Sequence, residues 1–582
     1  ETEYDADEFT VHQYDLTLGR AHITHVELRG EVPPDARLTA FLTFAPEGRD
    51  GRVGRLIHDG AGPEDGATVE VFHREEHDYV TASTGLSAVR GQVPERFDEL
   101  LGPVPVEFPR EVPLENYEDT HLSGDIVVSA PLERAGRGMR TTLVTQLSDH
   151  TETTRERALA DVRGAAEMHA SPDAVRDAAR ERVAVGVPDG TPREGVVTDD
   201  LRALSLLTAP TGARIAGPEF DPYYAYSGGY GYTWFRDDAE IAGYLLGAAD
   251  RLGLDLGDDP ERSARFHCDA QLEDGTWPHR AWAVDGSLAP GWAHARVENR
   301  DVPEYQADQT ASVVTFLAEL LRERGDDLDE SLRSRVRETV RQGVEGLDAT
   351  LDEDGLPERC QNLWEDTDGR FTHTAATFLE AYATVSRAPV GGEVRKHATV
   401  RAQEVMEGLD ALWEGSAGHY GLRLDGDDLD DRLDSGTFAL VSAFVEYDRA
   451  LGLSEDALDR LVSHVETALD GLYRETDDVQ GLVRYEGDPW RRRWQDEEKV
   501  WSVSTVWGAD AATRLAALLD RRDRTEESES LLEWAGHLYE VLSPDGPLCT
   551  DAGFLTEQVF DDGTPDSAAP LGWSHALRLH TT

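Results

Sequence analysis

The sequence predicts a multidomain protein: an N-terminal antiparallel β-sandwich, then an α/α barrel of six helical hairpins, twelve helices in all. Three observations support this fold class. Residues 1–150 contain short runs of alternating polarity between turn residues. From about residue 196 onward, apolar residues recur at i, i+3 and i+4. The loops between these expected helices alternate between brief and long. The first pattern is typical of strands and the second of amphipathic helices.

The first domain is assigned to residues 1–150. Runs such as 69–73 and 125–129 alternate polar and apolar residues, and Pro and Gly pairs separate the runs. Such period-two alternation indicates antiparallel strands with one buried face. Residues 151–195 are then rich in Ala, Arg and Glu up to the turn at 188–190. We interpret them as a helical linker.

The third segment, residues 196–582, is expected to hold all twelve helices. Ser454 is the predicted N-cap of the ninth helix, because its hydroxyl can accept from a free backbone N–H. Loops after odd-numbered helices are long and hold most of the tryptophans, so helices of alternating direction would place them at one end. A helical solenoid is the alternative, although no fixed-period repeat is visible. The expected spans are 196–207, 236–251, 258–271, 306–323, 329–351, 373–387, 393–413, 436–451, 455–474, 500–520, 525–542 and 572–580.

Acidic residues far outnumber basic residues in the chain. The formal net charge is −59, with 115 acidic and 56 basic residues. Lysine occurs only at Lys396 and Lys499. We interpret this as the surface of a halophilic protein, whose self-repulsion is screened by salt. Nucleic acid is excluded as a partner, because its phosphates would be repelled.

Other features limit the class of protein. No run approaches the roughly 18–20 apolar residues of a membrane helix, so no membrane partner is expected. No signal peptide is visible, which favours a cytoplasmic location, and secretion stays open because the numbering begins without Met. Cys268, Cys360 and Cys549 lie far apart and form no CxxC pair. They predict neither a zinc site nor a disulfide framework. The oligomeric state is left open.

Two carboxylates in separate long loops are the candidate catalytic pair. Glu365 lies in the run 363–366, and Glu557 lies in the run 555–558. Two carboxylates that face each other across a pocket are the apparatus of glycoside hydrolysis. Glu365 follows a tryptophan, and a carboxyl group that an indole partly desolvates suits a general acid. Glu557 is then the candidate base. Either residue alone would be read as a solvated loop carboxylate.

Further candidates for sugar contact lie in the other long loops. Arg236 offers a rigid fork of donors and Asp237 accepts from hydroxyls, although an ion pair at a helix start is the alternative. Trp277 is a candidate stacking platform or a core residue, as are Trp282 and Trp292. Arg484 is a second candidate donor to hydroxyls. The neighbouring arginines 491–493 are expected to pair with the acidic surface.

The ordered motifs of these loops resemble the glucoamylase family of inverting exo-glycosidases, in the prokaryotic form with an N-terminal β-sandwich. The resemblance covers about 200–580 and implies that Glu365 is the acid and Glu557 the base. It also implies that Arg236, Asp237 and Arg484 hold the terminal glucose. The matching pieces are 209–219, 232–237 with Trp234, 305–308, 363–366, 484–490, and 557–558 followed by 570–575.

The same resemblance assigns the lining of the glucose pocket. Tyr230 and Trp364 would line it. Asp366 stands where many members have Glu, which leaves the contacts to the next sugar open. Trp234, Trp277 and Asp366 complete the predicted substrate-binding set.

The expected function is that of an inverting, exo-acting α-glucoside hydrolase. It would release β-glucose from the non-reducing ends of α-1,4-glucans such as starch and maltooligosaccharides. This chemistry requires no metal or cofactor, and a structural calcium ion is left open at the acidic stretch 425–428. The alternatives are a related α-1,6-glucan or trehalose hydrolase, a phosphorylase on a similar barrel, and a non-catalytic glucan-binding protein.

Overall fold

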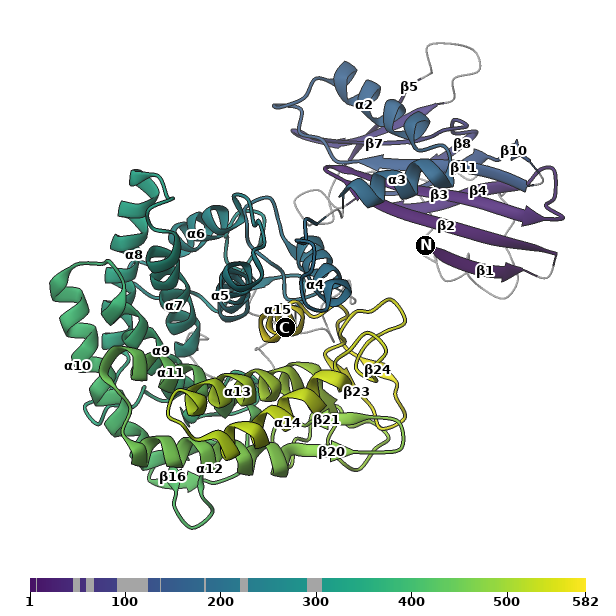
Figure 1. Ribbon diagram of the computed structural model, residues 1–582. Helices are drawn as coiled ribbons and strands as arrows, with labels where there is room; N and C mark the ends of the chain where they lie inside the picture. Colours follow the sequence, from purple (N-terminus) through teal and green to yellow (C-terminus); the bar gives the residue numbers. More distant parts are fainter. Residues whose placement is uncertain are drawn as a thin grey trace. The chain divides into compact units, whose positions relative to one another are not determined.

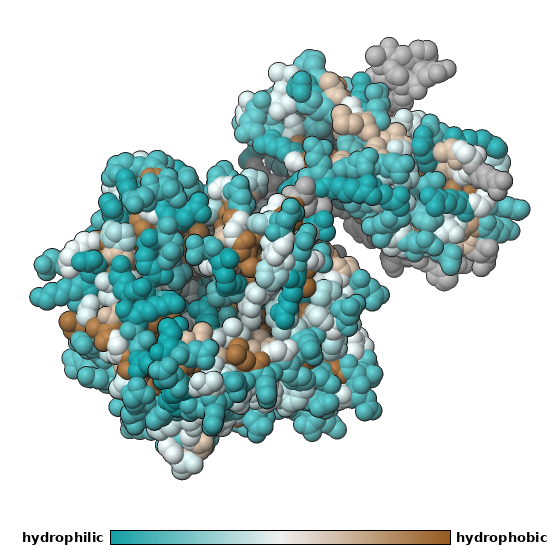
Figure 2. Space-filling view, in the orientation of Figure 1, coloured by the Kyte–Doolittle hydropathy of each residue, from teal (hydrophilic) through white to brown (hydrophobic). Residues whose placement is uncertain are grey.

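The computed structural model describes residues 1–6, 8–44, 53–58, 67–91, 124–136, 138–182, 185–219, 229–289 and 306–582. The chain divides into two compact units, Glu1–Ala184 and Val185–Thr582 (Figure 1). Hydrophilic residues cover most of the face seen in Figure 2.

The first unit is built on two antiparallel sheets. The larger has the strand order β1-β2-β3-β11-β7-β6-β5, with β10 paired to β11, and the smaller has the order β4-β9-β8. Ala40 and Val89 both pair with Val128 of the central strand of the smaller sheet. The strands are β1 Thr2–Ala6, β2 Phe9–Leu18, β3 Ala21–Gly30, β4 Arg37–Thr43, β5 Gly54–His58, β6 Thr68–His73, β7 Glu76–Ala82, β8 Ala88–Gly91, β9 Asp125–Pro131, β10 Glu133–Ala135 and β11 Gly138–Gln146.

Apolar side chains cover both faces of the larger sheet. Val69 and Val80 from this sheet and Ile126 and Val128 from the smaller one form a shared buried core. Helices α2 (Arg155–Met168) and α3 (Pro172–Arg182) contribute a second apolar cluster, which includes Val144 of β11. An antiparallel sheet domain at the N-terminus is therefore confirmed. The stretch 151–195, interpreted as a helical linker, contains two helices that pack on the sheet.

The second unit is helical, and each of the twelve expected spans overlaps a helix. Ser454, the predicted cap, accepts a hydrogen bond from the N–H of Ala457. The largest difference between an expected and an observed helix end is at α10. The sequence predicts an end at residue 413, but α10 ends at Gly408 because a 3-10 turn, Leu409–Leu412, follows it. The helices in the described part of this unit are α4 Glu194–Leu207, α5 Phe235–Leu252, α6 Asp259–Ala270, α7 Ala307–Arg324, α8 Glu330–Ala349, α9 Thr372–Arg387, α10 Gly392–Gly408, α11 Ala439–Leu451, α12 Glu455–Leu472, α13 Ser502–Asp520, α14 Thr525–Val541 and α15 Gly572–Thr581.

Every second helix belongs to an inner circuit. Helices α5, α7, α9, α11, α13 and α15 contact one another in that order, and α15 contacts α5. The remaining helices pack outside; α8, for example, packs on α7 and α14 packs on α13 (Figure 1). Inner helices are buried nearly all round, whereas outer helices such as α12 bury one stripe, because only that stripe meets a neighbour. This circuit has the order of contacts that an α/α barrel requires.

Long loops enter the inner helices at their N-termini. Short strands in these loops lead directly into the helices: β12 (Thr233–Trp234) into α5, β15 (Asp368–Phe371) into α9, and β22 (Val500–Trp501) into α13. Within the described residues, no helix is long and apolar enough to cross a membrane. The predicted site residues all lie in these loops or in the first turn of the helices that follow.

Candidate active site

Glu365 lies in the loop between β14 (Cys360–Gln361) and β15. Its side chain is 22% exposed, and its Oε1 lies 2.9 Å from Nε2 of His279. Burial, with help from the positive charges of Arg280 and Arg236, holds the pKa of His279 well below its usual value. The ring is therefore neutral and donates from Nε2 to the carboxyl group. Glu365 also has a φ of 63°, a left-handed conformation that is costly for a residue with a Cβ and is often found at functional sites.

Glu557 stands immediately before β23 (Gln558–Val559). Two donors reach the same oxygen, Oε2: the hydroxyl of Tyr230, and Nε2 of Gln558 at 2.8 Å. Burial and the charge of Glu557 raise the pKa of Tyr230 well above its usual value, so the hydroxyl keeps its proton. Ser567 donates to the Tyr230 oxygen at 2.7 Å. The backbone N–H of Ser502 donates to the backbone carbonyl oxygen of Glu557 at 2.9 Å. Oε2 is thus occupied by protein donors.

The loop that carries Glu365 is linked to the segment that carries Glu557 through strand β22. The rings of Trp364 and Trp501 lie 5.9 Å apart between centroids. Trp501 pairs across β22 and β23 with Gln558. Trp364 precedes Glu365, and Gln558 follows Glu557. Three segments that are distant in sequence are therefore connected by one pair of indole rings and one strand pairing.

Arg236 and Asp237 form a buried pair in the first turn of α5. Arg236 donates to Gln306 and to Asp308, both at 2.9 Å, and its guanidinium lies 3.5 Å from Oδ2 of Asp237. Burial raises the pKa of Asp237 to about 6 against the opposing effect of Arg236, and the charge of Glu365 adds to the rise. Among the described residues, Oδ2 of Asp237 has no hydrogen-bond partner. A sugar hydroxyl is a group that could satisfy it.

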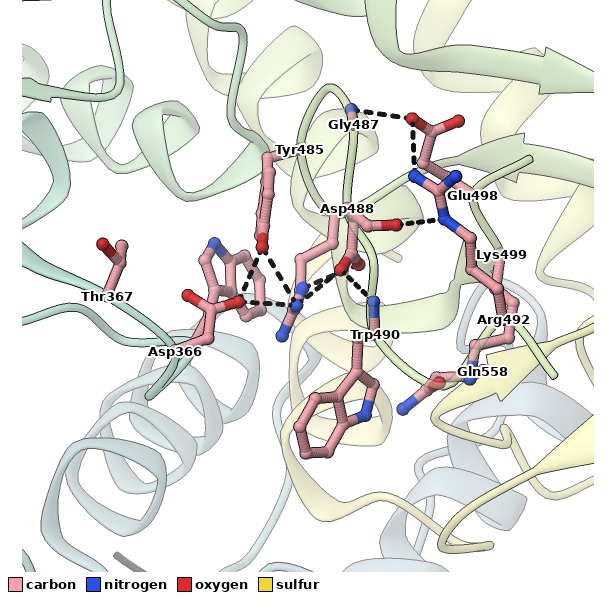
Figure 3. A network of polar contacts seen from close by, with 12 residues as sticks. Asp366, Thr367, Tyr485, Gly487, Asp488, Trp490, Arg492, Glu498, Lys499 and Gln558 are labelled. Carbon is pink, nitrogen blue, oxygen red and sulfur yellow. Dashed lines mark hydrogen bonds and ion pairs between the residues drawn. The ribbon is translucent and has the colours of Figure 1, made fainter. Parts of the chain in front are cut away.

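Arg484 is held between two carboxylates. It donates to Asp488 at 2.9 and 2.7 Å and to Asp366 at 2.8 Å. Its guanidinium lies 5.4 Å from the ring of Trp364 and 4.8 Å from that of Trp501. Figure 3 shows Asp366 and Asp488 on opposite sides of this network. The predicted residues Arg484, Asp366 and Trp364 are therefore brought together.

The two other predicted tryptophans have different surroundings. Trp234 is mostly buried and lies edge-on to His279, with ring centroids 4.6 Å apart. Trp277 is fully buried in the helical core, where its indole N–H donates to the carbonyl of His267 at 2.8 Å. Neither face of its ring is open to a sugar. Trp277 is therefore a core residue, and we leave it out of the proposed substrate site. Trp292 lies outside the described residues.

Four residues near the carboxylates were not singled out from the sequence. They are His279, Trp501, Asp434 and Lys499. Asp434 accepts from the indole N–H of Trp364 at 2.9 Å, and burial raises its pKa to about 7. Lys499 is buried against Asp566 at 2.8 Å, and burial lowers its pKa. The rarity of lysine could have drawn attention to Lys499, because the chain has only two lysines.

No metal centre is found in the part of the chain that the structure describes, where no three His, Cys, Asp or Glu side chains are arranged to hold an ion. In the acidic stretch considered for calcium, Asp425 accepts from Arg359 at 2.8 Å. This stretch is the turn between β18 (Arg423–Asp425) and β19 (Asp428–Asp430).

The helical unit has the sequence signature of a hydrolase family. Residues 193–582 match Glycosyl hydrolases family 15, which is more than half of the chain. The chain therefore belongs to this family, and the resemblance stated from the loop motifs is confirmed at that level. Residues 1–158 match a domain of unknown function (DUF7997).

Solved structures of similar fold include two glucoamylases. A bacterial glucoamylase complexed with acarbose has a TM-score of 0.65 and 13% identity, over 98% of this chain and 81% of that one. The glucoamylase of Saccharomycopsis fibuligera has a TM-score of 0.53 and 14% identity, over 68% of this chain and 96% of that one. At these identities the likeness concerns the fold. No curated protein matches the chain.

Proposed function

We propose that this glycoside hydrolase is an inverting, exo-acting enzyme that releases β-glucose from the non-reducing ends of α-1,4-glucans. The observation that carries the proposal is the pair of carboxylates, Glu365 and Glu557, whose segments are linked by the contact of Trp364 with Trp501 and the pairing of Trp501 with Gln558. The proposed chemistry needs no metal or cofactor. The closed circuit of inner helices supports an α/α barrel as its scaffold.

Glu365 is the proposed general acid. His279 donates to Oε1 of Glu365, which orients the carboxyl group for proton transfer to the glycosidic oxygen. The low exposure of the side chain disfavours its charged form, as a general acid requires. The neutral state of His279 suits this role, because an imidazolium would instead favour the ionised acid.

Glu557 is the proposed general base. Tyr230 and Gln558 occupy Oε2, so Oε1 is the atom that accepts a proton from the attacking water. Inversion requires water between the base and the sugar, and we expect the two carboxyl groups to be about 6.5–9.5 Å apart. A phosphorylase would need a basic phosphate pocket in place of this acidic one.

The terminal glucosyl unit would be held by the buried polar groups beside the acid. Oδ2 of Asp237 has no hydrogen-bond partner among the described residues and lies 3.5 Å from the Arg236 guanidinium, and Arg484 lies against the rings of Trp364 and Trp501. Support also comes from the structural relative that was solved with acarbose. The rival α-1,6-glucan and trehalose specificities are separated by initial rates on maltose, isomaltose, trehalose and starch measured side by side.

Substitution of each carboxylate tests the mechanism. Glu365→Gln and Glu557→Gln should each lower kcat on maltose by about 10²–10⁴-fold, because each removes one partner in proton transfer. Proton NMR of the first product should show β-glucose. Ordinary turnover in either variant, or α-glucose as the first product, would refute the assignment.

We further propose that the enzyme works at high ionic strength. The net charge of −59 supports this, because salt screens repulsion between like charges. The melting temperature should rise between 0.1 and 2 M KCl. A flat or falling dependence would argue against a halophilic enzyme.

A further inference from the structure

A buried polar network lies behind the segment that carries the proposed base. It consists of Asp200 on α4 and of His575 and Arg578 on α15, and all three residues are fully buried. Asp200 and His575 are 375 positions apart in the chain. Charged groups are costly to bury unless they are paired and hydrogen-bonded. The mechanism proposed above uses none of the three residues.

His575 accepts a hydrogen bond from the backbone of residues 555–558, here named the base segment. The N–H of Leu555, two residues before Glu557, donates to Nε2 of His575 at 3.0 Å. The carbonyl of Leu555 accepts from the N–H of Leu571, the residue before α15, at 3.1 Å. Both backbone polar groups of Leu555 are therefore held by the start of α15.

Asp200 fixes the tautomer of the His575 ring. A backbone N–H can only donate, so Nε2 carries no proton and acts as the acceptor. Nδ1 then carries the proton and donates to Oδ1 of Asp200 at 2.6 Å. Burial lowers the pKa of His575; Asp200 opposes this fall, Arg578 adds to it and Asp199 opposes it. A neutral ring with its proton on Nδ1 makes both hydrogen bonds.

Arg578 orients Asp200 for this contact. Its Nη2 donates to Oδ1 of Asp200 at 2.6 Å, and its Nε donates to Oδ1 and Oδ2 at 3.1 and 3.2 Å. The guanidinium is always charged, so Asp200 is its buried counter-charge. Nη1 donates to the carbonyl of Leu542, at the end of α14, at 2.6 Å. The network thus joins α4, α14 and α15.

A second contact from the first turn of α15 reaches the base segment. The hydroxyl oxygens of Ser574 and Ser502 lie 2.8 Å apart. The N–H of Ser502 in turn donates to the carbonyl of Glu557 at 2.9 Å. This turn therefore supports the base segment at two points, at Leu555 through His575 and at Glu557 through the two serines.

We propose that His575 is a positioning residue for the general base Glu557. Asp200 and Arg578 hold its ring in the state that accepts from the Leu555 N–H. A base must be aimed at its water, and a small misplacement of a catalytic group lowers the rate of the chemical step. This inference rests on the proposed function and deepens it: the orientation of the base depends on α4, at the start of the helical unit.

Variants of His575 test the proposal. His575→Phe keeps a ring in place but cannot accept from the Leu555 N–H, so kcat on maltose should fall by about 10- to 100-fold while KM stays within about twofold. His575→Gln carries an amide oxygen that can accept, and it should restore most of the lost kcat. His464→Phe is the matched control. His464 is also fully buried and accepts from a backbone N–H, that of Tyr420 at 3.2 Å, but it lies on α12.

His464→Phe should lose stability and keep the wild-type kcat. All kinetics are measured at a temperature at which circular dichroism shows each variant folded. An equal fall of kcat in His575→Phe and His464→Phe would mean that only general stability was lost, and it would overturn the positioning role.

Amide exchange measures the positioning without the reaction. Hydrogen–deuterium exchange of a peptide that covers residues 555–558, followed by mass spectrometry, should be about tenfold faster in His575→Phe than in wild type. His464→Phe should leave this peptide unchanged. If His575→Phe does not fold, ¹⁵N NMR of histidine-labelled wild type decides, with the His575 signals identified by their loss in His575→Gln. A proton on Nε2 would overturn the inference, and a proton on Nδ1 alone supports it.

The outcomes separate this inference from the proposed function. If wild type releases no glucose from maltose, the proposed function fails, and the exchange comparison still decides whether His575 holds the base segment. If wild type releases glucose and His575→Phe matches it in kcat and in exchange, the positioning role is refuted while the enzyme stands.

Discussion

The loop that carries Glu365 and the loop that carries Glu557 hold their carboxyl groups differently. Glu365 accepts from a neutral ring, that of His279, and has a left-handed backbone. Glu557 accepts from Tyr230 and Gln558 on one oxygen and immediately precedes β23, which pairs with β22. A general acid must gain and lose its proton, whereas a general base must stay ionised and correctly oriented. The two carboxyl groups are thus oriented by different kinds of donor, and variants of these donors test the two proposed roles.

Buried packing supports the segment that carries His279. Trp277 precedes His279 by two residues and is fully buried. Trp277→Ala should lower the free energy of unfolding by about 3–5 kcal/mol, because it leaves a large cavity. Urea unfolding measures this loss. If Trp277 were instead a sugar platform, stability would be retained and KM would rise.

The base side should respond strongly to the loss of one donor. Tyr230→Phe removes the hydroxyl that reaches Oε2 of Glu557. A hydrogen bond to a charged group is worth about 1.5–3 kcal/mol, so kcat should fall by about 10- to 100-fold. Steady-state kinetics on maltose measures the effect. An unchanged kcat would mean that Gln558 alone orients the base.

A buried carboxyl group beneath the acid side gives a pH-dependent prediction. Asp434 has a model-peptide pKa of 3.8 and a pKa of about 7 in the folded chain, because burial disfavours its charge. The folded chain therefore binds this proton more tightly, so the stability that Asp434 contributes is present below pH 4 and is lost as the pH rises through 7. Asp434→Asn removes the charge.

The variant should gain about 1–3 kcal/mol of stability relative to wild type between pH 5 and pH 8. Urea unfolding of both proteins at the two pH values measures this gain. A difference between the proteins that stays constant with pH would contradict the role given to Asp434.

The smallest effect is expected at the donor to the acid. His279→Ala removes a hydrogen bond to the Glu365 carboxyl group, worth about 1 kcal/mol, so kcat should fall by about fivefold. His279→Gln, which can still donate, is the matched control. A loss larger than that of Tyr230→Phe would reverse the contrast between the two loops.

Much of the fold could be predicted from local patterns. The twelve helical spans followed from apolar spacing, and the cap at Ser454 followed from residue type. These features depend on residues within one or two turns of each other. The helical character of residues 155–182 was also predicted from the sequence. Their packing on the sheet was not predicted, because it depends on β strands far away in sequence.

The candidate site was only partly predictable. Glu365, Glu557, Arg236, Asp237 and Arg484 were selected because charged residues beside aromatic residues in long loops suit sugars, and the structure places them in buried, hydrogen-bonded positions. Trp277 and Trp364 look alike in sequence. One is packed under helices and the other donates to Asp434 and lies beside Arg484, because the surroundings of an indole in a loop depend on the neighbours that the fold supplies.

The sequence by itself determined the helical periodicity, the acidic net charge and the choice of two candidate carboxylates, since each depends on residue type and local spacing. Only the tertiary structure decided that Trp364 would meet Trp501, that a neutral His279 would face Glu365, and that Tyr230 would donate to Glu557. Each of these contacts joins segments far apart in the chain. Such contacts form when the inner helices close their circuit, and no local pattern encodes which loops then become neighbours.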